Sequence, residues 1–279
     1  MFGMILMTIS AAWVGSGDAP EGVAEALAPT MVRLRAGEYS PVDIARTLGS
    51  GGGNLVEFSQ PPVSRGFFGA EGATRQAQPL PRTIAIRGGE KTFWAAIDEI
   101  CHESGLRPVA GAGGQSRVVL VPASRDPGFV SNEGAFRVAI SRLSYNRGWP
   151  IPPDRARRGS GLEVGQRRSA AGLLRVELDV MIEPRLRIVK VDGVSVSTAA
   201  DERGRSLLIG AAGSDHTDPS DHVMGASGCT VALGLLYPDE PGRTIETLRG
   251  EVALVAEGGK PAKPRRVKVG FSFKNIPMP

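Results

Sequence analysis

Side chains that can bind a metal ion are concentrated in one segment, Ser214-Asp-His-Thr-Asp-Pro-Ser-Asp-His222. Imidazole and carboxylate groups suit Zn²⁺ or Mn²⁺, so the candidate ligands are His216, His222 and Asp218. The two histidines are six residues apart in a proline-containing stretch, and this spacing matches no known ligand motif. We therefore expect a solvated loop between two strands, and a metal site at residues 215–222 is the alternative.

No other residue pattern points to catalysis. His102 follows Cys101 directly, and neighbouring residues on a helix point about 100° apart, which is a poor arrangement for a nucleophile and its base. The sequence has no G-x-S-x-G, H-E-x-x-H, Walker lysine or C-x-x-C motif. We assign no catalytic residue and no cofactor, and we predict that the protein is not an enzyme.

Composition indicates a globular chain of short strands and many turns. Its 279 residues include 37 glycines and 21 prolines, and 41% are hydrophobic. The net charge is +4, and the densest basic run lies at residues 155–168 among Pro and Gly, without interleaved aromatics. We expect a solvated loop there and no nucleic-acid partner, with an anionic polymer as the alternative partner. Cys101 and Cys229 are expected to be buried free thiols.

The first residues suggest export. Residues 2–14 form an apolar run of the length of a signal-peptide core, and small residues follow up to Ala19. No Lys or Arg precedes the run, and the alternative is a buried N-terminal element. We expect residues 1–19 to be a signal segment, which would place the protein in the periplasm or cell envelope and limit membrane association to the N-terminus.

An internal repeat organises the first half of the chain. Residues 32–48 (VRLRAGEYSPVDIARTL) and 84–100 (IAIRGGEKTFWAAIDEI) align without gaps at an offset of 52. Three identical residues recur in the two copies: Arg35, Gly37 and Glu38 as Arg87, Gly89 and Glu90. Each copy predicts a short strand, a helix capped by Ser40 or Thr92, a glycine and another strand. We therefore predict βαβ modules at residues 30–58 and 82–123, joined by a linker at residues 59–81.

This order of elements resembles the short N-terminal module of secretins and TonB-dependent receptors. The helix of the second copy, Trp94-Ala-Ala-Ile-Asp-Glu-Ile100, fits the pattern of that family better than the first does. The resemblance implies interaction and assembly elements in the periplasm, and it brings no catalytic residues.

The second half of the chain is predicted to form strands. Apolar residues recur at every second position over residues 174–182, and again over residues 267–273. Seven or eight such segments predict an immunoglobulin-like antiparallel β-sandwich at residues 134–279. The predicted fold class is α+β, and the whole order resembles uncharacterised bacterial envelope proteins.

Together these patterns predict a non-enzymatic envelope protein that interacts or assembles with other envelope proteins. The alternative is a hydrolase or a carbohydrate-active or carbohydrate-binding protein with a dispersed site, and a metal-dependent version of it would use residues 215–222.

Overall fold

The fold is built mainly from strands. The computed structural model describes residues 27–50, 53–59, 79–111, 116–123, 128–146, 172–209, 227–238, 240–258 and 264–279. Of these residues, 62% lie in strands and 13% in two helices. The predicted α+β class is therefore wrong, because strands occupy far more of the described residues than the two described helices do.

The N-terminal unit (residues 27–123) contains both copies of the repeat. The first copy (residues 30–59) holds β1 (Met31–Leu34), β2 (Gly37–Tyr39), α2 (Pro41–Ser50) and β3 (Leu55–Phe58). The second copy (residues 82–123) holds β4 (Ile84–Ile86), β5 (Gly89–Thr92), α3 (Phe93–Ser104), β6 (Leu106–Ala110) and β7 (Arg117–Pro122).

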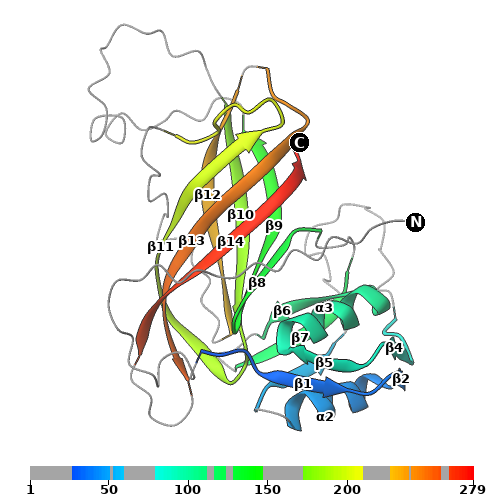
Figure 1. Cartoon of the computed structure of the whole chain (residues 1–279). Coiled ribbons are helices and arrows are strands. Elements are labelled where there is room, and N and C mark those ends of the chain that lie inside the picture. Colours follow the sequence, from blue (N-terminus) through cyan, green and yellow to red (C-terminus); the bar gives the residue numbers. More distant parts are fainter. Residues whose placement is uncertain are drawn as a thin grey trace, which may run out of the picture.

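The two copies interlock through an antiparallel ribbon (Figure 1). Strand β1 pairs with β5, and β2 pairs with β4, so each strand of one copy finds its partner in the other copy. The two ladders keep one register: Met31 pairs with Thr92 and Leu34 with Gly89, then Gly37 with Ile86 and Tyr39 with Ile84. The ribbon therefore needs both copies.

This arrangement corrects the prediction of two βαβ modules. A βαβ unit places its two strands in parallel in one sheet, whereas β1 and β3 of the first copy belong to different sheets. The three-stranded sheet has the order β3-β7-β6, with β3 parallel and β6 antiparallel to β7. One hydrophobic core contains Ile44 and Leu48 of α2 together with Trp94 and Ile97 of α3.

Both helices begin as the sequence predicts, and α3 also ends at its predicted glycine, whereas α2 runs past Gly49 to Ser50. The Thr92 side chain accepts a hydrogen bond from Ala95 N, and Gly105 ends α3 in the left-handed conformation. Ser40 Oγ likewise accepts from Asp43 N at 3.2 Å. These capping predictions are confirmed.

The two-sheet unit (residues 128–279) contains the longer strands. They are β8 (Val130–Glu133), β9 (Phe136–Asn146), β10 (Gly172–Ile182), β11 (Leu186–Asp201), β12 (Gly228–Tyr237), β13 (Thr244–Gly258) and β14 (Arg265–Pro277). One sheet has the order β12-β10-β9-β8 and the other β11-β13-β14, and every neighbouring pair is antiparallel.

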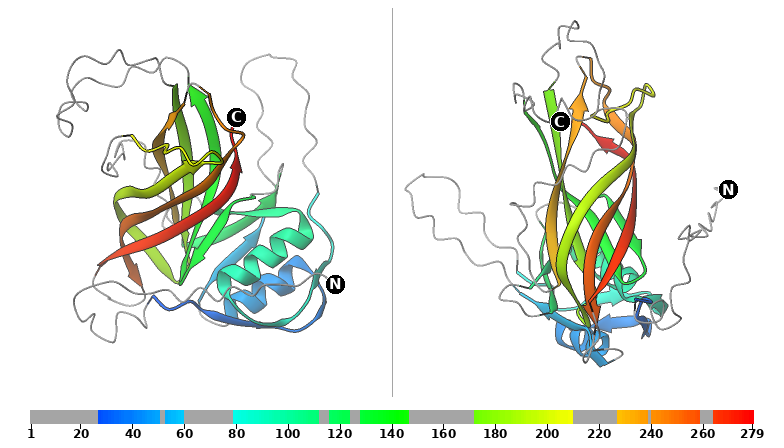
Figure 2. Two further views of the ribbon diagram at one scale, coloured as in Figure 1. Left: turned by 45° about the horizontal axis from the view of Figure 1, so that its top comes forward. Right: turned by 90° about the vertical axis from the view of Figure 1, so that its left-hand side faces the viewer.

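A single core fills the space between these two sheets (Figure 2). It is built mainly from Val, Leu and Ile at alternate positions of the strands. Side chains and a short segment connect the sheet edges. Glu133 and Ser131 of β8 accept hydrogen bonds from the β14 backbone, and Leu207 bridges Ala199 of β11 and Leu236 of β12.

Candidate interaction surface

Helix α3 of the second copy is docked on the two-sheet unit. Trp94 is buried, and its Nε1 donates to the carbonyl oxygen of Ala135, in the turn between β8 and β9, at 2.9 Å. One helical turn further on, Asp98 accepts from Arg137 Nε at 3.0 Å and from Asn132 Nδ2 at 2.7 Å. Since the Arg137 side chain is only 3% exposed, this ion pair belongs to the contact between the two units.

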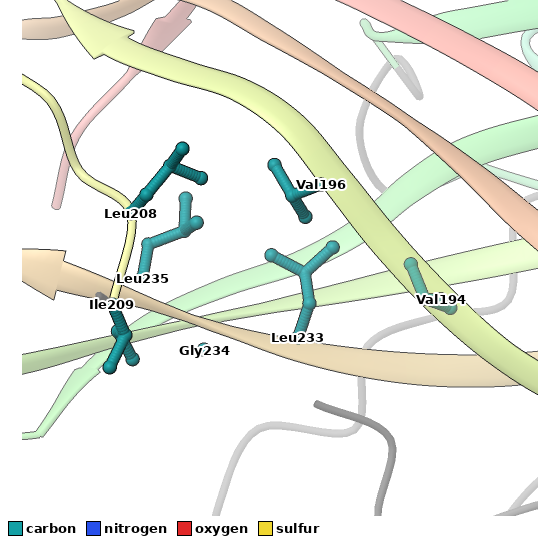
Figure 3. A pocket seen from close by; sticks show the side chains of 7 residues that line it. All are labelled: Val194, Val196, Leu208, Ile209, Leu233, Gly234 and Leu235. Carbon is teal, nitrogen blue, oxygen red and sulfur yellow. The ribbon is translucent and has the colours of Figure 1, made fainter. Parts of the chain in front are cut away.

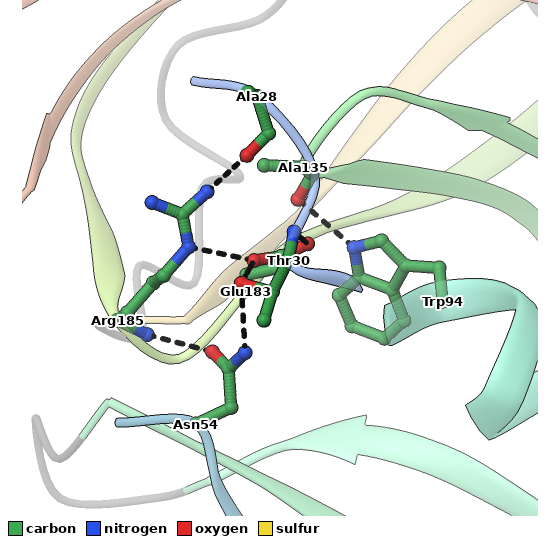
Figure 4. A network of polar contacts seen from close by, with 7 residues as sticks. All are labelled: Ala28, Thr30, Asn54, Trp94, Ala135, Glu183 and Arg185. Atoms are coloured by element: carbon green, nitrogen blue, oxygen red, sulfur yellow. Dashed lines mark hydrogen bonds and ion pairs between the residues drawn. The ribbon is translucent and has the colours of Figure 1, made fainter. Parts of the chain in front are cut away.

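A buried carboxylate makes the second contact between the units (Figure 4). Glu183 follows β10, and its side chain is fully buried. It accepts hydrogen bonds from Thr30 N at 2.8 Å, from Thr30 Oγ1 at 2.5 Å and from Arg185 Nε at 2.7 Å. A buried charge is stable only when it is paired and hydrogen-bonded, and these contacts meet both conditions.

Asn54 extends this network to the start of β3. Its Nδ2 donates to Thr30 Oγ1 at 3.2 Å, and its Oδ1 accepts from Arg185 N at 3.1 Å (Figure 4). The carbonyl of Ala135 accepts from Glu183 N as well as from Trp94, so the two contacts between the units share one acceptor. The polar groups of this cluster bind one another, which indicates a structural role.

The corresponding face of the first copy is exposed. The repeat places Val42 of α2 at the position of Trp94, and Arg46 at the position of Asp98. The exposed fraction of Val42 is 65%, and that of the Arg46 side chain is 73%. The two helices therefore differ at this repeat position, because the apolar residue is exposed on α2 and buried on α3. We define the α2 face as Val42 and Arg46.

The first copy also has an open strand edge. Ser59 N donates to Leu120 O, so the backbone groups of odd-numbered residues in β3 face β7, and those of Val56 and Phe58 point away from it. Within the described ranges, no strand pairs with this side of β3. The other edge strand, β6, has Pro108 at an outward position, which removes a donor and protects that edge.

A small apolar cavity lies among the described residues. It lies between β11 and β12 and has a volume of about 10 Å³ (Figure 3). It is lined by Val194, Val196, Leu208, Ile209, Leu233, Gly234 and Leu235. Sites for small molecules usually measure about 300–1,000 Å³, so this cavity has room for no more than about one water molecule.

The candidate metal ligands His216, His222 and Asp218 lie outside the described residues, as do residues 1–19 and the arginine run at 155–168. Where the chain is described, no three His, Cys, Asp or Glu side chains gather in a way that could hold a metal ion. The predicted linker at residues 59–81 is described only at its two ends.

The two cysteines are free and buried, as predicted. Burial raises the pKa of Cys101 to about 12 and that of Cys229 to about 12, which disfavours the reactive thiolate at neutral pH. His102 is exposed, so Cys101 and His102 face different surroundings and do not form a nucleophile–base pair.

Sequence reasoning did not identify the α2 face. The signal was present in the repeat, because an apolar residue and a charged residue four positions later occur in both helices. Which of the two helices has a partner depends on where the two-sheet unit lies.

Comparison with known proteins finds no matching family model, no similar curated protein and no similar solved structure. In the part of the chain that the structure describes, no helix has the length and apolar character needed to cross a membrane.

Proposed function

We propose that this protein is a non-enzymatic component of the bacterial cell envelope that binds and assembles with other envelope proteins. The proposal rests on a difference between the two copies of the repeat. Trp94 and Asp98 of the second copy are occupied by the two-sheet unit, whereas Val42 and Arg46 of the first copy remain exposed. This difference between two equivalent helix faces supports the proposal, since exposed apolar area can mark a site of protein–protein interaction.

The open edge of β3 supports the same role. An unpaired strand edge can accept an extended segment of another protein through main-chain hydrogen bonds. Leu55 lies on this strand and is 49% exposed, so the edge also offers apolar area to a partner. The apolar run at residues 2–14 supports export, which would bring this surface into contact with envelope proteins.

A cross-linking experiment in intact cells tests the proposal. A photo-reactive amino acid replaces Val42 in the full-length chain, and a control chain carries it at Ser197, which is exposed on the two-sheet unit. We expect a discrete cross-linked adduct from position 42 in the envelope fraction and none from position 197. A chain that stays in the cytoplasm at full mass, or equal labelling at both positions, would refute the proposed function.

A further inference from the structure

The internal docking of α3 serves as a template for a ligand of α2. The turn of the β8–β9 hairpin presents the Ala135 carbonyl to Trp94, and the following strand presents Arg137 to Asp98. One end of a β-hairpin thus offers an acceptor and a charged group to a single helix face. The 52-residue offset places Val42 and Arg46 at the positions of Trp94 and Asp98, although Val42 has no hydrogen-bond donor to replace the indole N–H.

Building on the proposed function, we infer that the α2 face binds a β-hairpin of an acidic partner protein. On α3 the helix supplies the carboxylate and the hairpin supplies the arginine. On α2 the helix supplies the arginine, so the hairpin must supply a carboxylate at the position that Arg137 occupies in the internal contact.

The same charges disfavour the β8–β9 hairpin of a second copy of this chain as the occupant. The β8–β9 hairpin of a second copy would bring Arg137 close to Arg46, and these two positive charges would repel each other. That hairpin is also already engaged with α3 in each molecule. The inferred partner is therefore a different protein, and its hairpin carries Asp or Glu.

Arg46 can give up its present ion pair with Asp43 and pair with a carboxylate of the partner instead. Its NH1 contacts Asp43 Oδ1 at 2.9 Å, but both side chains are at least half exposed. Ion pairs of this kind contribute little to stability, because solvent screens the charges and ordering two exposed side chains costs entropy.

Val42 is smaller than Trp94, so the partner hairpin would fill the remaining space with a larger apolar side chain of its own. In Figure 1, α2 lies at the lower end of the molecule and α3 lies nearer the two-sheet unit.

A charge-swap titration tests the inference. The probes are two disulfide-cyclised hairpin peptides copied from residues 130–139, one with Arg137 retained and one with the Arg137→Glu change. Binding to the full-length chain is measured by calorimetry or fluorescence anisotropy at low salt. We expect the acidic peptide to bind at least tenfold more tightly than the basic one, and Arg46→Glu in the chain to reverse this preference.

Further variants keep the test specific. Val42→Asp should abolish binding of the acidic peptide, whereas Arg107→Glu, a matched change at an exposed arginine of β6, should leave it unchanged. Circular dichroism checks that each variant is folded. Equal affinity for the two peptides, or no response to Arg46→Glu, would overturn the inference. If the cross-link at position 42 still forms in that case, the proposed function stands and only the acidic hairpin is refuted.

Discussion

Replacing Gly88 by alanine should damage the ribbon that joins the two copies. Gly88 has φ +77°, in the left-handed region, and an added Cβ would lie 2.4 Å from Ala36 N and 2.9 Å from the carbonyl carbon of Arg35. Both atoms belong to the backbone that connects β1 to β2, so neither can move away without shifting the chain. Gly105 is a matched control, because it has φ +66° but nothing within 4 Å of an added Cβ.

The magnitude follows from these two geometries. The left-handed conformation costs alanine about 1–2 kcal/mol, and reduced entropy of the unfolded chain returns about 0.4–1 kcal/mol. Gly105→Ala should therefore lower the free energy of unfolding by about 1 kcal/mol. Gly88→Ala carries the same cost and also the displacement of backbone, for which overpacking typically adds about 1–3 kcal/mol. We expect a total loss of about 2–4 kcal/mol.

Urea unfolding followed by circular dichroism measures both variants at one pH and one protein concentration. A lower midpoint with an unchanged slope means lost stability rather than a changed denatured state. An equal loss of stability in the two variants would contradict this prediction. Conformational strain would then account for the whole effect, and the close approach of Gly88 to Ala36 would contribute nothing.

Three further changes test the contacts described above. Trp94→Phe removes the hydrogen bond to Ala135 and part of a buried ring, and it should lower the free energy of unfolding by about 1–3 kcal/mol in urea titrations. Glu183→Gln removes the charge that Arg185 pairs with, and thermal unfolding should show a loss of about 2 kcal/mol, whereas the same change at the exposed Glu246 should have almost no effect. Burial, assisted by the nearby Glu251, raises the pKa of Glu133, so its proton is held more tightly in the folded state and stability should fall as pH rises through that pKa. Urea midpoints between about pH 4 and 8 should lose this dependence in Glu133→Gln, and an unchanged profile would contradict the assignment.

Local features of the fold were predictable from the sequence. The caps at Ser40 and Thr92 depend on hydrogen bonds to residues three positions later, so the signal lies within one turn of helix. The strand at residues 174–182 was evident from its alternation, because one of its faces is buried by the opposite sheet. Elements of this kind can be predicted because the residues that define them are close together in the sequence.

Pairing was not predictable in the same way. Strands β2 and β5 are short and largely polar, and they exist because each meets a strand of the other copy about 50 residues away. Residues 186–201 form the single strand β11, whose register against β13 shifts at several points, and no local pattern indicates these shifts. Gly250 lies inside the continuous strand β13, where the absence of a side chain allows close approach to Ser195 O and the ring of Phe271.

The repeat, the caps, the buried cysteines and the alternation of the long strands follow from residue types and short-range spacing. The shared ribbon of the two copies, and the covering of α3 but not of α2, follow from contacts between segments far apart in the chain. Val42 and Trp94 occupy the same repeat position, and both are apolar. Burial of one and exposure of the other depend on where the β8–β9 hairpin lies, and that position is set by packing between segments far apart in the chain.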